Sequence, residues 1–123
     1  MDIKKLILCV HSLVVGHTKS PKGILNQNAL GSISTGVNQF FGDTELYPSI
    51  ESKAAFLAFA IIQDHVFEEG NKRTGIGVLL TYLKQNGISL VFSQAELVDL
   101  GLGIATSKYK QPEILNWINN HKS

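Results

Sequence analysis

Residues 50–63, IESKAAFLAFAIIQ, decide the fold class of this 123-residue chain. From Ala54 to Ile62 the segment contains only apolar residues, and Ser49 directly before it is a good helix N-cap. A helix that is apolar on every side is typical of one buried at the centre of a protein. We therefore predict a buried central helix that begins after Ser49 and ends near His65, with the rest of the chain packed around it.

The sequence after this segment predicts a second long helix. It begins with Asn71, a fair N-cap, and ends before Gly87. Gly75 and Gly77 within it each cost about 1 kcal/mol relative to alanine, which favours a close approach of another backbone or of a ligand. Its apolar face is expected to consist of Ile76, Leu79, Leu80 and Leu83.

The N-terminal part of the chain predicts weaker elements. A helix capped by Asp2 is expected over residues 2–15, with Gly16 as its stop. Its core-facing residues are expected to be Leu6, Cys9, Val10, Leu13 and Val14. A loop over 17–23, a second helix over 26–39 and an exposed turn or short hairpin over 40–48 follow.

Two more helices complete the prediction. Ser93 and Glu96 have the spacing of a capping box, and Pro112 suits the first turn of the last helix. Together these segments predict a compact all-α bundle of five to six helices, forming one domain over residues 1–123.

Composition excludes two classes of protein. A hydrophobic content of 44% excludes intrinsic disorder. The single Cys9, expected in the core, excludes a disulfide-stapled secreted scaffold.

Charge and hydropathy narrow the class of protein. A net charge of +1 gives no reason to expect the broad basic surface that binds DNA non-specifically. No apolar run approaches the length of a membrane span, and His11 interrupts the short run that resembles a signal peptide. We therefore expect a cytoplasmic protein without membrane attachment. Its ten lysines accompany a single arginine, Arg73, which suggests a place where planar bidentate geometry matters.

The ten residues HVFEEGNKRT, beginning at His65, carry the candidate chemistry. They link two predicted helices, where free N–H groups and the helix dipole favour an anion. Gly70 lets a phosphate approach the backbone, and Lys72 and Arg73 are unfavourable in a first helical turn unless a multiply charged anion is bound. Glu69 is a candidate ligand for Mg²⁺, and His65 is a candidate general base. The pattern predicts transfer of a group from a nucleotide to a hydroxyl.

A structural interpretation of the same residues stays open. A histidine at a helix end is more often a cap or a partner of the dipole than a base, and the glutamates alone are typical of solvated charges. Phe67 is a core anchor under either interpretation. The structural interpretation does not explain why these residue types occur together. A zinc site from Cys9, His11 and His17 is not expected, because their spacing is not that of a closed site.

The same ten residues resemble the signature of the Fic/Doc superfamily, His-x-Phe-x-[Asp/Glu]-[Gly/Ala]-Asn, followed by the Lys-Arg-Thr of its Doc (death-on-curing) branch. A softer resemblance to the Doc branch extends over residues 41–48, the Ala-rich helix before the motif and residues 82–87. The resemblance implies a compact all-α fold. It also implies that residues 41–48 lie near a flap that aligns a target segment in extended form.

Carried over residue by residue, the resemblance implies a role for each matching position. His65 is the catalytic base, Phe67 a buried structural anchor and Glu69 the ligand of Mg²⁺. The phosphates of ATP are held by Gly70, Asn71, Lys72 and Arg73.

Two departures from the AMP-transferring Fic branch bear on the reaction. Fic enzymes end their motif Gly-Asn-Gly-Arg-x-x-Arg, whereas here Lys72 replaces the second glycine and Ile76 the second arginine. The lysine side chain crowds the nucleotide pocket that the second glycine leaves open. Without the second arginine, the usual contact with the outer phosphates is missing. In the Doc branch this is associated with transfer of the γ-phosphoryl group, by a kinase unrelated to the eukaryotic fold. An AMP (nucleotidyl) transferase and a catalytically inactive nucleotide- or antitoxin-binding module remain as alternatives.

The resemblance further implies a biological role. Doc-type proteins are toxins of toxin–antitoxin systems that modify a translation elongation factor, elongation factor Tu, and arrest translation. A separate small antitoxin restrains them by folding as a helix into a hydrophobic groove. This chain lacks the [Ser/Thr]-x-x-x-Glu-[Gly]-Asn-type inhibitory helix of some Fic proteins. We therefore expect a cognate antitoxin and an elongation factor as partners.

Overall fold

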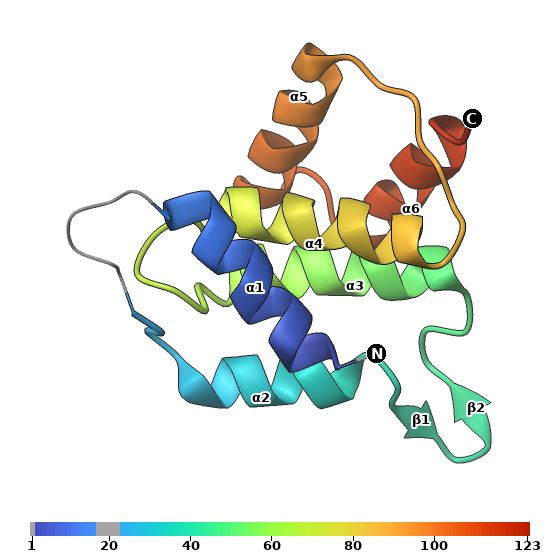
Figure 1. Cartoon of the computed structure of the whole chain (residues 1–123). Helices are drawn as coiled ribbons and strands as arrows, with labels where there is room; N and C mark the ends of the chain where they lie inside the picture. The colour runs from blue at the N-terminus through green and yellow to red at the C-terminus, as the bar shows by residue number, and fades with distance from the viewer. Residues whose placement is uncertain (1, 17–22) are drawn as a thin grey trace.

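The computed structural model describes residues 2–16 and 23–123, which form six helices and a two-stranded hairpin (Figure 1). The predicted all-α class is confirmed. The loop predicted over 17–23 lies largely outside the described residues. In chain order the elements are α1 (Ile3–Val15), α2 (Gln27–Gly36), β1 (Phe40–Phe41), β2 (Thr44–Glu45), α3 (Ile50–Gln63), α4 (Asn71–Gln85), α5 (Gln94–Ala105) and α6 (Gln111–Asn120).

Helices α3 and α4 lie side by side at the centre of the molecule, and the other helices surround them (Figure 1). Two glycines of α4 allow this packing. A Cβ built on Gly75 would lie 2.7 Å from Ile62 Cγ1, and one built on Gly77 would lie 2.7 Å from Val10 Cγ1. Such separations do not occur in close-packed interiors. The predicted close approach of another backbone is confirmed at Gly75, where Ala58 O of α3 would lie 3.1 Å from the Cβ. At Gly77 the close neighbour is a side chain of α1 and not the predicted backbone or ligand.

Most helix ends follow the predicted capping signals. Asp2 accepts the N–H of Lys5, while Ser49 and Ser93 each begin a capping box. Pro112 lies in the first turn of α6. Helix α2 ends at Gly36, three residues before its predicted end. Among the described residues, no helix has both the length and the apolar character needed to cross a bilayer.

The buried face of α1 differs from the predicted one. Its buried residues are Ile3, Leu6, Ile7, Val10 and His11. Cys9 is exposed, and Leu13 is 79% exposed, so the assignment of both to the core is wrong. The apolar run Leu6–Val10 leaves the rotation of the helix undetermined, and contacts with α2 and α4 decide it.

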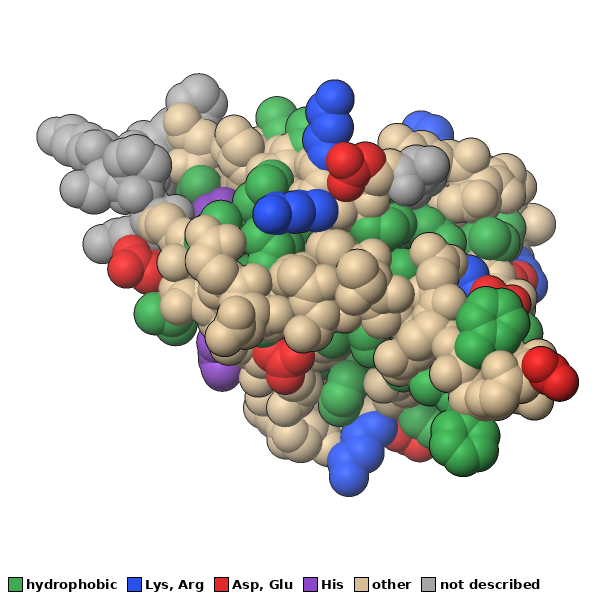
Figure 2. All heavy atoms as spheres, turned by 90° about the horizontal axis from the view of Figure 1, so that it is seen from below, with side chains coloured by type: hydrophobic (Ala, Val, Ile, Leu, Met, Phe, Trp, Pro, Cys, Tyr) green, Lys and Arg blue, Asp and Glu red, His purple; other side chains and the backbone are tan. Residues whose placement is uncertain are grey.

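The predicted hairpin forms β1 and β2, which pair in antiparallel register around Gly42, whose φ is +63°. It extends from the body of the molecule beside the start of α3 (Figure 1). Phe40 and Phe41 are 60% and 80% exposed. Figure 2 shows hydrophobic side chains projecting at this end of the molecule.

Candidate active site

The connection between α3 and α4 reverses the chain within a few residues. Asp64 caps α3 by donating its N–H to Ala60 O at 2.9 Å. His65 has a φ of +46°, a left-handed conformation that costs a non-glycine residue roughly 1–2 kcal/mol. Val66 and Phe67 are then buried, whereas His65 is exposed. The reversal returns the chain to the core and leaves the imidazole exposed, where it can act as a base.

The buried part of this connection is tied to the segment that leads into α2. Val66 O accepts the N–H groups of Leu25 at 2.8 Å and of Asn26 at 3.1 Å. On the other side of Phe67, Glu68 donates its N–H to Gly23 O at 3.2 Å. Backbone hydrogen bonds to a remote segment thus hold the connection in place.

Asn71 closes the loop with its side chain. Its Oδ1 accepts the N–H of Phe67 at 3.0 Å, and its Nδ2 donates to Phe67 O at 2.8 Å. The N-cap of α4 is Gly70, and Asn71 is the first helical residue. The prediction of Asn71 as the N-cap is therefore wrong by one residue, because the turn before the helix uses both ends of its amide.

Gly70 brings the start of α4 against α1. Its φ is +82°, and a Cβ there would lie 3.1 Å from Val15 Cγ1 and 3.4 Å from Val14 Cγ1. Conformation and space together favour glycine. Within residues 2–16 and 23–123, the backbone N–H groups of residues 70–73 make no hydrogen bond. These donors can bind an anion at the positive end of the helix dipole.

Charged side chains surround this helix start. Glu69, Lys72 and Arg73 are all exposed. Lys72 and Arg73 stand at one end of a pocket of about 500 Å³ between α4 and α5. Its remaining lining is mostly apolar: Ile76, Gly77, Leu80, Gln94, Leu97, Val98, Gly101 and Leu102. The arrangement suits a ligand with an anionic group and an apolar part.

The residues present fit a magnesium ion that binds together with a phosphate. No group of three or more His, Cys, Asp or Glu side chains positioned to hold a metal is found in the part of the chain that the structure describes. Glu69 is exposed and directly precedes Gly70, the N-cap of α4. Mg²⁺ keeps several waters and commonly takes one or two carboxylates plus substrate phosphates. Of the residues considered for zinc, His17 lies outside the described residues.

His11 of α1 is a part of the site that the sequence interpretation missed. Its ring stacks on that of Phe67, with centroids 3.6 Å apart and an interplanar angle of 7°. Its Nε2 lies 3.1 Å from Glu69 O. A usable signal was the spacing of Ile3, Ile7 and His11, which stand four residues apart and so share one face of the helix.

Lys53 of α3 is the second missed residue. It is 7% exposed, and its Nζ lies 2.5 Å from Glu45 Oε1 while also donating to Tyr47 O. Tyr47 in turn stacks on Phe56, with centroids 4.5 Å apart. These contacts fix the hairpin to α3.

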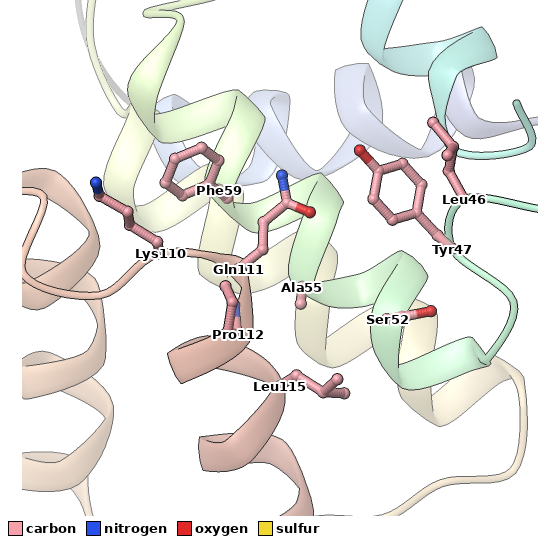
Figure 3. Close-up of a pocket in the computed structure, with 9 residues that line it drawn as sticks. All are labelled: Leu46, Tyr47, Ser52, Ala55, Phe59, Lys110, Gln111, Pro112 and Leu115. Atoms are coloured by element: carbon pink, nitrogen blue, oxygen red, sulfur yellow. The ribbon is translucent and has the colours of Figure 1, made fainter. Parts of the chain in front are cut away.

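A groove lies beside this anchored hairpin. It encloses about 560 Å³ over α3, between Tyr47 on one side and Phe59 and Pro112 on the other (Figure 3). Figure 3 also shows Leu115 of α6 and Ala55 of α3 along its floor and lower edge. Most of the residues that line the groove are apolar.

Together these features define a helical protein in which the N–H groups at the start of α4 can bind an anion, next to an exposed histidine and glutamate. A sequence model of the Fic/DOC family matches residues 3–83, more than half of the chain, and the protein belongs to this family. It is similar to protein kinase doc of Escherichia phage P1, with 38% identity over 64 residues. That match covers 52% of this chain and 49% of the phage protein, so the chain matches about half the length of its relative.

Proposed function

We propose that this protein is the toxin of a toxin–antitoxin pair and acts as an ATP- and Mg²⁺-dependent protein kinase. The observation that carries the proposal is the start of α4, where the N–H groups of residues 70–73 have no hydrogen-bond partner among residues 2–16 and 23–123. The exposed Glu69, Lys72 and Arg73 belong to the same segment. Exposed His65 stands on the same short connection. Similarity to a protein named as a kinase supports the choice of reaction.

Each residue then has a role in phosphoryl transfer. The N–H groups of residues 70–73 bind the phosphates of ATP, and Lys72 and Arg73 offset their charge. Glu69 would hold a Mg²⁺ ion, which would neutralise further phosphate charge. His65 accepts the proton of the target hydroxyl while the oxygen of that hydroxyl forms a bond to the γ-phosphorus. The bond from that phosphorus to the β–γ bridging oxygen breaks, and ADP leaves with the electron pair.

The pocket beside α4 favours γ-phosphoryl over AMP transfer. Ile76, at the position where Fic enzymes carry their second arginine, is 8% exposed and lines the pocket without a charge. Lys72 lines the same pocket where those enzymes have a glycine. Both differences change the side chains available to bind the outer phosphates. The way these phosphates are bound determines whether the α- or the γ-phosphorus faces the acceptor hydroxyl.

The proposed acceptor is a hydroxyl on a translation elongation factor, elongation factor Tu, presented in an extended segment. The exposed Phe40 and Phe41 and the groove lined by Tyr47 and Phe59 offer apolar surface for such a segment. The proposed regulator is a separate antitoxin that docks as a helix.

The test is label transfer from ATP. Purified protein is incubated with Mg²⁺, a cell extract or elongation factor Tu, and ATP labelled at the α- or the γ-phosphate. The matched inactive variant is His65→Asn, because asparagine tolerates the left-handed conformation but cannot act as a base. We expect γ-label on one dominant protein, absent with His65→Asn.

Other outcomes would point elsewhere. Transfer of α-label would make the protein an AMP transferase. No transfer of either label, once a bound antitoxin has been excluded, would leave the binding-module interpretation. Unchanged transfer by His65→Asn would show that His65 is not the base.

A further inference from the structure

His11 connects α1 to the loop before α4 across 58 positions of the chain. The histidine is 7% exposed. Its Nε2 lies 3.1 Å from Glu69 O, and its ring covers that of Phe67. Its Cδ2 stands 3.7 Å from the position that a Cβ of Gly70 would take. His11 thus contacts Phe67 and Glu69, and its ring occupies part of the space beside Gly70.

The hydrogen bond fixes the proton on the ring. A carbonyl oxygen accepts and does not donate, so Nε2 must carry the hydrogen that it shares with Glu69 O. The contact therefore holds the Glu69 carbonyl toward α1 and the buried Phe67.

The direction of this carbonyl also sets the direction of the next N–H. The described residues contain no cis peptide bonds, and in a planar trans peptide the C=O and the N–H point to opposite sides. With the Glu69 carbonyl turned to His11, the Gly70 N–H is turned away from α1. A hydrogen bond that fixes the orientation of this peptide matters at position 70, because the backbone of glycine rotates more freely than that of other residues.

We propose that His11 is a positioning residue for phosphate binding: its Nε2–H holds the Glu69 carbonyl inward and so directs the Gly70 N–H toward the bound phosphates. This inference rests on the proposed function, because it assigns the anion to the same helix start. His11 does not contact the phosphates itself. The ring stack on Phe67 is the packing part of the contact, and the N–H is the positioning part.

Two substitutions separate these parts. His11→Phe keeps a ring over Phe67 but has no N–H, whereas His11→Gln loses the ring but keeps an amide donor that can reach Glu69 O. His121→Gln is the control, because His121 also stacks on an aromatic ring, that of Trp117, and bonds a backbone carbonyl. His121 lies at the C-terminal end of α6, and within the described residues it has no hydrogen bond or ring stack with the loop before α4.

The measurements are the affinity for Mg²⁺·ATP by calorimetry and the Gly70 amide resonance by nitrogen-15 NMR. We expect His11→Phe to weaken binding roughly ten-fold, because the Gly70 N–H is no longer directed into its charge-assisted hydrogen bond with the phosphate. His11→Gln is expected to restore most of the affinity, and His121→Gln to leave it unchanged. Equal affinities for His11→Phe and the wild type would overturn the proposal, as would weakening by His11→Gln equal to that by His11→Phe.

The ligand-free protein distinguishes this proposal from the proposed function. Without ATP, the Gly70 amide resonance is expected to move in His11→Phe and to return toward its wild-type position in His11→Gln. If the wild type neither binds ATP nor transfers label, the proposed function fails, and the phosphate role of His11 fails with it. If the Gly70 resonance still moves in His11→Phe and returns in His11→Gln, His11 would orient the Glu69–Gly70 peptide without a role in phosphate binding. A resonance identical in all variants would reject the orientation argument whatever the enzyme does.

Discussion

The side-chain amide of Asn71 makes two hydrogen bonds to the backbone of one residue, Phe67, at 3.0 Å and 2.8 Å. Phe67 is 1% exposed, so water cannot replace these partners without opening the loop. The pair closes the turn that carries Glu69 and Gly70. The loop geometry is thereby coupled to the first residue of α4.

Replacement of Asn71 by alanine is expected to lower the free energy of unfolding by about 2–4 kcal/mol, because two buried backbone groups lose their partners. Urea denaturation measures this change. The control is Asn86→Ala, which removes one hydrogen bond, to Tyr82 O, at the exposed end of α4 and is expected to cost about 1 kcal/mol or less. Equal losses in the two variants would contradict the closing role of Asn71.

Gly75→Ala is expected to destabilise the protein although alanine is the better helix former. The new methyl group would meet Ile62 Cγ1 at 2.7 Å and Ala58 O at 3.1 Å, an overpacking that costs typically about 1–3 kcal/mol. Gly31→Ala in α2 is the matched control, because no atom lies within 4 Å of its new methyl group. It is expected to stabilise by about 0.5–1 kcal/mol. Thermal unfolding of both variants checks the opposite signs.

Lys53→Met is expected to detach the hairpin. The buried ammonium serves both Glu45 and Tyr47 O, so its loss is expected to cost about 1–3 kcal/mol and to speed amide exchange over residues 40–47. Lys122→Met is the control, since the side chain of Lys122 is 39% exposed, against 9% for that of Lys53. That variant is expected to change stability by less than about 1 kcal/mol. Unaltered exchange in the hairpin of Lys53→Met would refute the anchoring role.

The pair His121–Glu96 is expected to make stability depend on pH. Hydrogen bonds from the Ser93 N–H and then from His121 lower the pKa of Glu96 to about 2. The Trp117 carbonyl, followed by Glu96, raises the pKa of His121 above 6.5. Both ring nitrogens of His121 face acceptors, which fits the protonated imidazole.

The signs of the two contributions are opposite. The contribution of His121 is fully present below about pH 6.5 and is lost as the pH rises through the raised pKa. That of Glu96 is present above about pH 4.5 and is lost as the pH falls toward about 2. Thermal unfolding of the wild type and His121→Gln should therefore differ more near about pH 5.5 than near about pH 9, and less at high salt. A difference independent of pH would contradict the assignment.

The sequence determined much of this protein through local signals. Ser49 and Ser93 mark helix starts because their side chains bond to N–H groups a few residues away, within the same segment. The uniform apolar run in α3 predicts central burial because no rotation of such a helix places a polar face inward. The motif from His65 to Thr74 is contiguous, so its residue types could be recognised together before any fold was known.

Tertiary structure decided which of these residues touch. The apolar run of α1 fits several rotations, and packing against α2 and α4 selected the one that buries His11 and exposes Cys9. The contact of His11 with Glu69 and the burial of Lys53 under the hairpin depend on segments brought together by folding. Helix periodicity and capping act within one or two turns, so they cannot specify partners across the chain. The sequence therefore determined the helices and the candidate motif, and packing decided how the motif is held.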